Sequence, residues 1–205
     1  MLMNPEKMIA IVIAFGMTNF VTAQTLTDRI KDAKVSGAPV VVGVLGEVQP
    51  LTVEELSAQS DLVLEAKLSR LRTYVNARDT AVVTDFAIIP DRALKGSVTS
   101  ATMTPGIAAP LILTTLGGEV VRDGILVTTE NHNMRPLREG VQYLLFLTKF
   151  GTEKGVYQIF NAAAFELTGD RIRMLAYNSS AAYKDIEGTP YGPVAARVLE
   201  AAQSK

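Results

Sequence analysis

Short apolar runs rich in β-branched residues, separated by glycine, proline or polar segments, recur throughout the sequence after residue 37. Runs of this length and composition predict strands. They span residues 38–45, 61–75, 80–89, 111–121, 125–130, 141–148, 157–167 and 171–177. Closing such strands into a barrel removes the exposed edges at which a sheet pairs with other chains. We therefore predict an all-β fold with some helix: a small OB-like β-barrel, closed or partly open.

The run at residues 141–148 (VQYLLFLT) is the most apolar one beyond the N-terminal region, and it predicts a central strand buried on both faces. The segment 61–75 is ambiguous, because its apolar residues fit both the alternation of a strand and one face of a helix. We favour a strand. A bulge near Ser69 would explain why the apolar parity changes along it.

Turn residues predict how these strands connect. Residues 122–124 and 169–170 each predict a hairpin. The glycine pair at 117–118 indicates a bend or bulge within a strand pattern. The strand at 80–89 is expected to end near Pro90, because proline cannot donate to a strand ladder.

Two helices and two irregular segments are expected between and around the strands. Thr52 and Glu55 have the spacing of a capping box, which predicts a short helix before the first barrel strand. Residues 193–203 predict an amphipathic C-terminal helix that begins with proline. The polar segment 24–36 reads as a tether or a frayed helix, and the threonine-rich segment 97–109 reads as a long mobile loop.

The N-terminal region resembles an export signal. Lys7 precedes an unbroken apolar run at residues 8–15, and small side chains lead up to Ala23. The run is short for a membrane span, so cleavage after Ala23 is favoured over an uncleaved anchor, which stays open. The predicted organisation is a signal peptide at 1–23, an extension at 24–59, a β-barrel domain at 60–178, and a loop with the C-terminal helix at 179–205. A cleaved chain would reside in the periplasm or outside the cell, without a stable membrane anchor.

Composition excludes several classes of chemistry. With no cysteine and one histidine, the chain has no disulfide scaffold, no thiol nucleophile and no zinc site that needs two or more Cys or His ligands. The net charge of -1 provides no overall surplus of positive charge for binding nucleic acid. No cofactor or metal is expected.

The single histidine, His132, follows a predicted strand and lies close to Glu130. One interpretation makes His132 a general base or a single metal ligand supported by Glu130 or Glu119. The other interpretation, which we favour, is a solvated loop histidine among turn-forming neighbours. The four acids Glu119, Asp123, Glu130 and Glu139 could converge as paired carboxylates, although their spacing does not require it.

Arg135 and Arg138 belong, with Arg122, to the densest group of basic residues. They are candidates for a carboxylate or phosphate clamp, with surface ion pairs as the alternative. The candidate ligand-binding residues are therefore His132, Glu130, Arg135 and Arg138. The candidate binding loops are 97–109 and 131–138, since binding residues concentrate on loops held by a rigid scaffold.

Several stretches resemble a family of uncharacterised secreted bacterial proteins whose barrel is similar to the netrin and metalloproteinase-inhibitor domains of OB type. They are residues 60–63 (SDLV), 84–96 (TDFAIIPDRALKG), 116–118 (LGG) and 137–147 (LREGVQYLLFL). The resemblance implies a barrel of five or six strands and no established reaction. The inhibitors of this fold use an N-terminal cysteine, which this chain lacks, so their mechanism and their binding residues do not carry over.

Three functions are compatible with the sequence. The leading hypothesis is an exported, non-catalytic β-barrel module that binds a protein or a small ligand of the cell envelope. The second is a periplasmic or secreted hydrolase that uses His132 with nearby carboxylates. The third is an envelope structural or interaction protein that associates through its C-terminal helix.

Overall fold

The computed structural model describes residues 24–98, 101–104, 107–177, 183 and 186–203. The predicted signal at 1–23 lies outside these residues. The described chain is mostly β. Its helices are α1 (Leu26–Ser36), α2 (Val53–Gln59) and α3 (Tyr191–Gln203), and its strands are β1 (Val40–Val44), β2 (Leu62–Val75), β3 (Val82–Lys95), β4 (Ala101–Thr104), β5 (Ile107–Ala109), β6 (Leu111–Leu116), β7 (Gly118–Arg122), β8 (Ile125–Asn131), β9 (Gln142–Lys149), β10 (Val156–Thr168) and β11 (Arg171–Met174). None of the described helices is long and apolar enough to cross a membrane.

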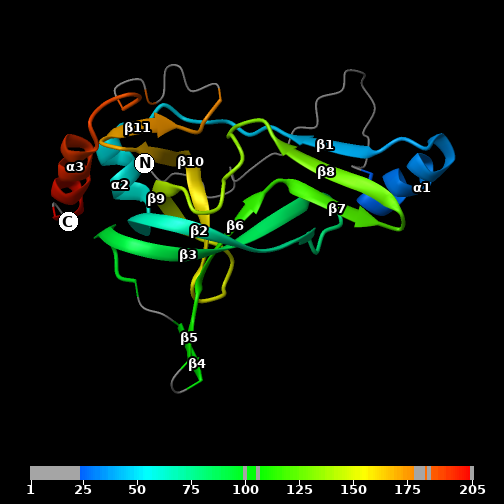
Figure 1. Cartoon of the computed structure of the whole chain (residues 1–205), viewed down its shortest axis with the longest axis horizontal. Coiled ribbons are helices and arrows are strands. Elements are labelled where there is room, and N and C mark those ends of the chain that lie inside the picture. Colours follow the sequence, from blue (N-terminus) through cyan, green and yellow to red (C-terminus); the bar gives the residue numbers. More distant parts are fainter. Residues whose placement is uncertain (1–23, 99–100, 105–106, 178–182, 184–185, 204–205) are drawn as a thin grey trace, which may run out of the picture.

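Five strands form a ring of hydrogen-bonded neighbours in the order β10-β6-β3-β2-β9, which closes because β9 also pairs with β10. Within the ring only β10 and β6 run parallel. The order β9-β2-β3-β6 is that of a Greek key, in which a fourth strand returns beside the first of three consecutive strands. β11 extends the ring from β10, and β1-β8-β7 forms a separate sheet in which β1 runs parallel to β8 (Figure 1).

Strand β9 is apolar at consecutive positions because both of its faces are buried. Tyr143 and Leu145 point into the ring, where they join a cluster of buried side chains from β2, β3 and β6. Leu144 and Phe146 point to the other face, where α2 and α3 cover them. The predicted burial on both faces is confirmed, and the interior of the ring is filled by side chains.

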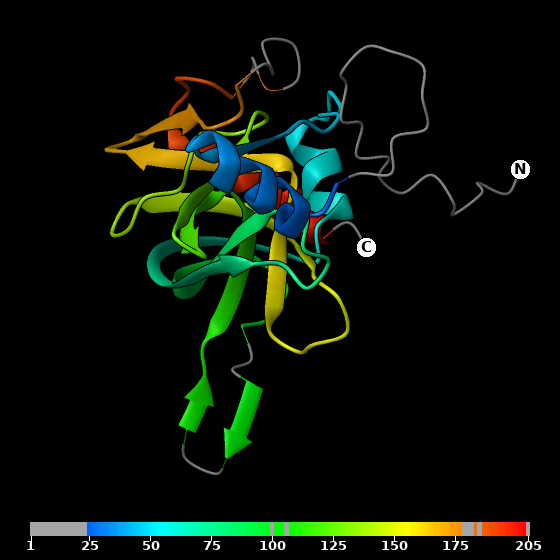
Figure 2. The ribbon, with the colours of Figure 1, turned by 90° about the vertical axis from the view of Figure 1, so that its right-hand side faces the viewer.

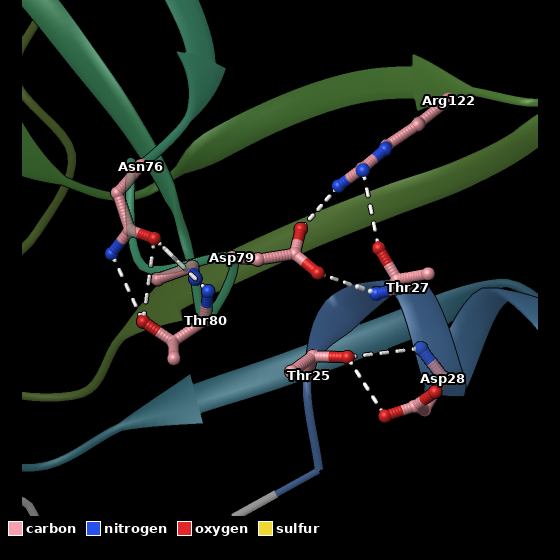
Figure 3. Close-up of polar contacts among 8 residues, drawn as sticks. Thr25, Thr27, Asp28, Asn76, Asp79, Thr80 and Arg122 are labelled. Carbon is pink, nitrogen blue, oxygen red and sulfur yellow. Dashed lines mark hydrogen bonds and ion pairs between the residues drawn. The ribbon is translucent and has the colours of Figure 1, made fainter.

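Helix α1 is a packed element, so the prediction of a tether or frayed helix at 24–36 was wrong. Leu26, Ile30 and Ala33 recur at helical spacing, are all buried, and pack with β1 and β8. The first turn of α1 is hydrogen-bonded to Asp79, in the turn between β2 and β3. Leu26 N–H donates to the carbonyl of Asp79 at 2.7 Å, and Thr27 N–H donates to its carboxylate at 2.9 Å. Arg122 from β7 also pairs with that carboxylate, as Figure 3 shows.

The expectation of a long mobile loop at 97–109 was also wrong in part, because residues 101–104 and 107–109 pair as the antiparallel hairpin β4–β5. This hairpin projects from the body of the protein (Figures 1 and 2). Its threonine and isoleucine content favours strand pairing, whereas the Pro-Gly dipeptide between the two strands favours a turn.

The end of the strand predicted near Pro90 was misplaced, since β3 continues to Lys95. Pro90 is paired with Ala66 of β2 on one side of β3. On the other side, β6 pairs with β3 only up to Ile88. Pro90 therefore lies beyond the part of β3 that has two neighbours, where a missing N–H is tolerated.

Helices α2 and α3 are joined by a two-bond contact between Glu54 and Arg197. Arg197 Nε donates to Glu54 Oε1 at 2.6 Å, and its Nη2 donates to Oε2 at 3.0 Å. This hydrogen bonding lowers the pKa of Glu54 from 4.5 to about 2. The predicted capping box of α2 is confirmed on the same helix, with Thr52 and Glu55 bonding each other's backbone.

The depressed pKa predicts an acid-dependent contribution of this contact to stability. A carboxylate with a lowered folded-state pKa stabilises the fold fully above pH 4.5 and loses this effect as the pH falls to about 2. Because Glu54 is about half exposed, we expect Glu54→Gln to cost only about 0.5–1 kcal/mol at neutral pH. Melting temperatures of both proteins should converge between pH 4.5 and 2. The exposed Glu47→Gln is the control, and a gap that stays constant across that range would contradict the assignment.

Candidate functional site

The connection between β8 and β9 is anchored in the ring by two buried side chains. Met134 and Leu137 are each 5% exposed and pack inside the ring with Tyr143 and Leu145. The residues between and beside these two anchors therefore point outward. The short sequence Met-Arg-Pro-Leu-Arg thus fixes a loop to the core and presents cationic side chains to solvent.

Residues 175–177, which follow β11, hold this loop in place. Arg135 N–H donates to the carbonyl of Leu175 at 2.8 Å, and Tyr177 N–H donates to the carbonyl of Asn133 at 2.9 Å. Met134 and Ala176 form an antiparallel bridge between these bonds. The loop is consequently fixed by backbone pairing, so its arginines rest on a rigid support.

A cleft of about 340 Å³ lies where this loop meets β10 and β11. Its lining combines three arginines, one carboxylate and three apolar or aromatic side chains: Arg135, Pro136, Arg138, Glu166, Arg173, Leu175 and Tyr177. Counting formal charges, three cations and one anion leave the cleft at +2, whereas the whole chain is at -1. Positive charge is therefore concentrated at this place.

One arginine of the cleft is held by an internal carboxylate. Arg138 Nη2 donates to Glu166 Oε2 at 2.7 Å, and this hydrogen bond raises the pKa of the Arg138 guanidinium. The Glu166 side chain is only 13% exposed. Glu166 also lies directly opposite Arg173 in the β10–β11 pairing. Arg138 thus pairs with a partly buried carboxylate, and Arg173 occupies the facing position on β11.

The backbone beside Arg138 is fixed from within the ring. Tyr143 is fully buried, and its hydroxyl accepts a hydrogen bond from Arg138 N–H at 2.9 Å. Burial raises the pKa of the Tyr143 hydroxyl, so this group stays neutral at physiological pH. A buried core residue therefore fixes the backbone position from which the Arg138 side chain extends.

The other two arginines lie differently. The Arg135 guanidinium lies 6.0 Å from the centre of the Tyr177 ring, a cation–π distance, and Tyr177 is 51% exposed. Arg173 is exposed on β11. Arg135 and Arg173 thus add two cationic side chains to the cleft lining, next to an accessible aromatic ring.

The four candidates from the sequence do not form one site. Arg135 and Arg138 line the cleft. His132 and Glu130 do not; they form a separate solvent-exposed pair with Nε2 and Oε2 3.9 Å apart. The His132 ring lies against Gly43 of β1, where an added Cβ would approach Nε2 to 2.6 Å. His132 therefore packs over an edge strand and does not line this cleft.

The acids considered for a paired-carboxylate site also lie apart or have other partners. Asp123 is 3.8 Å from Lys34. Glu139 accepts a hydrogen bond from Arg70 N–H at 2.7 Å. Among the residues that the structure describes, no three His, Asp or Glu side chains gather in a way that could hold a metal ion.

Glu166, Arg173 and Tyr177 line the cleft but were not predicted from the sequence. A signal for the first two existed, because a two-residue hairpin at 169–170 places Glu166 opposite Arg173. The proximity of Tyr177 to Arg135 had no local signal, since it depends on a pairing between segments about forty residues apart.

No known protein family has a model that matches this chain, and the search of curated proteins found no match either. The site must therefore be interpreted from its own geometry.

Proposed function

We propose that this protein is an exported, non-catalytic module that binds an anionic ligand in the cleft formed by Arg135, Arg138 and Arg173. The observation that carries the proposal is that three arginine side chains, from two separate chain segments, line one recess of about 340 Å³. Guanidinium groups form paired hydrogen bonds with carboxylate and phosphate groups. A fixed loop over a filled ring suits binding, because the recognition groups are already in position.

We further propose that the ring is a barrel of OB type, as the resemblance to netrin-like domains implies. The Greek-key order of β9-β2-β3-β6 and the return of β10 between β9 and β6 support this. Because side chains fill the ring, ligand binding at its rim is the arrangement that this barrel allows. Export to the periplasm or beyond rests on the sequence of residues 1–23.

The proposal is tested by charge reversal at the cleft. In calorimetric titrations with phosphate and with small carboxylates, we expect at least one anion to bind. Arg173→Glu should weaken this binding at least tenfold, because it replaces an attractive charge with a repulsive one. The matched control is Arg78→Glu, a reversal at an exposed position of the turn between β2 and β3.

Equal weakening by both reversals would indicate a general charge effect and would contradict a cleft site. Absence of binding for every anion tested, with the fold verified by circular dichroism, would refute the proposal. Increasing salt should reduce the measured affinity, since ions screen exposed charges.

A further inference from the structure

We infer that the cleft binds the doubly charged head group of a phosphate monoester, and that Glu166 sets the charge selectivity by cancelling one of the three arginines. This inference rests on the proposed function and adds the chemical class of the ligand. It follows from the charge of the lining, from the two chain segments that supply its arginines, and from the exposed apolar side chains beside them.

The formal charge of the lining matches a dianion. Its three arginines and one glutamate, Glu166, leave a charge of +2. Glu166 lies against Arg138 at 2.7 Å with its side chain 13% exposed, so this carboxylate and this guanidinium neutralise each other. Arg135 and Arg173 therefore carry the net charge of the cleft. A dianion balances that charge, whereas a monoanion leaves one positive charge unbalanced.

The two arginines that carry this charge belong to different segments. Arg135 lies on the loop at 133–138, and Arg173 lies on β11. A carboxylate has two oxygens and is matched by a single guanidinium fork. A phosphate monoester has three terminal oxygens, so it can accept hydrogen bonds from guanidinium groups on two sides. The division of the arginines between two segments therefore favours a phosphate group over a carboxylate.

The exposed apolar side chains of the lining favour an ester over inorganic phosphate. Pro136 is exposed on the loop, and Tyr177 is 51% exposed with its ring centre 6.0 Å from the Arg135 guanidinium. An organic group attached to the phosphate can lie against these two side chains, and a planar one can stack on the tyrosine ring. Inorganic phosphate has no group that makes such contacts.

Calorimetry on the purified protein at pH 8 tests the ligand class, since a phosphate monoester with a second pKa of about 6 carries two charges there. Phenyl phosphate and phenyl sulfate are similar in shape, but the sulfate ester carries one charge. We expect phenyl phosphate to bind at least tenfold more tightly than phenyl sulfate. It should also bind at least threefold more tightly than succinate, a dianion with two carboxylates, and than inorganic phosphate.

Two variants change the charge of the lining in opposite directions. Glu166→Gln raises it to +3 and should strengthen phenyl phosphate binding at least fivefold, with a smaller gain for phenyl sulfate, because the attraction scales with the charge of the ligand. Arg173→Gln lowers it to +1 and should reduce the preference for phenyl phosphate over phenyl sulfate to less than threefold. Glu119→Gln on β7 and Arg78→Gln in the β2–β3 turn, both at exposed positions, are the matched controls.

Equal affinities for the two phenyl esters, or no binding of phenyl phosphate, would overturn this inference. So would succinate or inorganic phosphate bound as tightly as phenyl phosphate. Each of these results leaves the proposed function intact as long as one anion binds at the cleft. Weaker binding of phenyl phosphate by Glu166→Gln would overturn the charge-cancelling role of Glu166, because it would show that this side chain holds Arg138 in place for the ligand. If no anion bound, or if the cleft variants acted no more strongly than their controls, the inference and the proposed function would fail together.

Discussion

Replacing Phe165 by alanine is expected to lower the free energy of unfolding by about 3–5 kcal/mol, the usual cost of removing a buried aromatic side chain. Phe165 on β10 is fully buried beneath the helices. Its ring lies edge-on to Phe146 at 5.9 Å and to Tyr183 at 5.5 Å. The substitution therefore removes hydrophobic burial and two aromatic contacts together.

Chemical denaturation followed by circular dichroism measures this effect. Phe150→Ala is the matched control, because Phe150 is 45% exposed just after β9; we expect it to cost less than about 1 kcal/mol. Similar losses from both substitutions would contradict the packing of β10 beneath α2 and α3.

The second large effect is expected at Lys95, the last residue of β3. Its ammonium group donates to the carbonyl oxygens of Ser57, Ala58 and Ser60, the last at 2.7 Å. These carbonyls lie at the C-terminal end of α2, where the last turn of a helix has no partners of its own. Lys95 therefore joins α2 to the ring through a charged cap.

Lys95→Met keeps most of the length of the side chain and removes its charge and its donors. We expect a loss of about 2–3 kcal/mol, because hydrogen bonds to charged groups contribute about 1.5–3 kcal/mol and the carbonyls next to buried Ser57 and Ser60 lose their partner. Lys67→Met, at an exposed position of β2, should change stability by less than about 0.5 kcal/mol. A loss below 0.5 kcal/mol for Lys95→Met in thermal and urea unfolding would show that the cap contributes nothing measurable.

Strands could be predicted from the sequence where buried residues alternate along the chain or follow one another without a break. Segment 61–75 is confirmed as β2, and its register shifts between Arg70 and Arg72, close to the bulge expected near Ser69. The glycine pair at 117–118 does mark a break, between β6 and β7. These features depend on neighbouring residues, and the hairpin at 169–170 followed in the same way.

Features that depend on contacts between segments far apart in the sequence were harder to predict. The loop at 131–138 was identified as a candidate from its composition, and Arg135 and Arg138 do line the cleft. Their separation from His132 was not predictable, because it results from the buried anchors Met134 and Leu137. Likewise, nothing local indicates that Tyr177 lies against Arg135.

The most direct test of the account is a map of amide chemical shifts in the ¹⁵N-labelled protein during titration with phosphate and with small carboxylates. We expect the largest changes in the two segments that line the cleft, residues 133–138 and 173–177, with saturation at a single site. Changes centred on His132, Glu130 and the adjoining β1, with the cleft unaffected, would contradict the claim that the three arginines form the binding site.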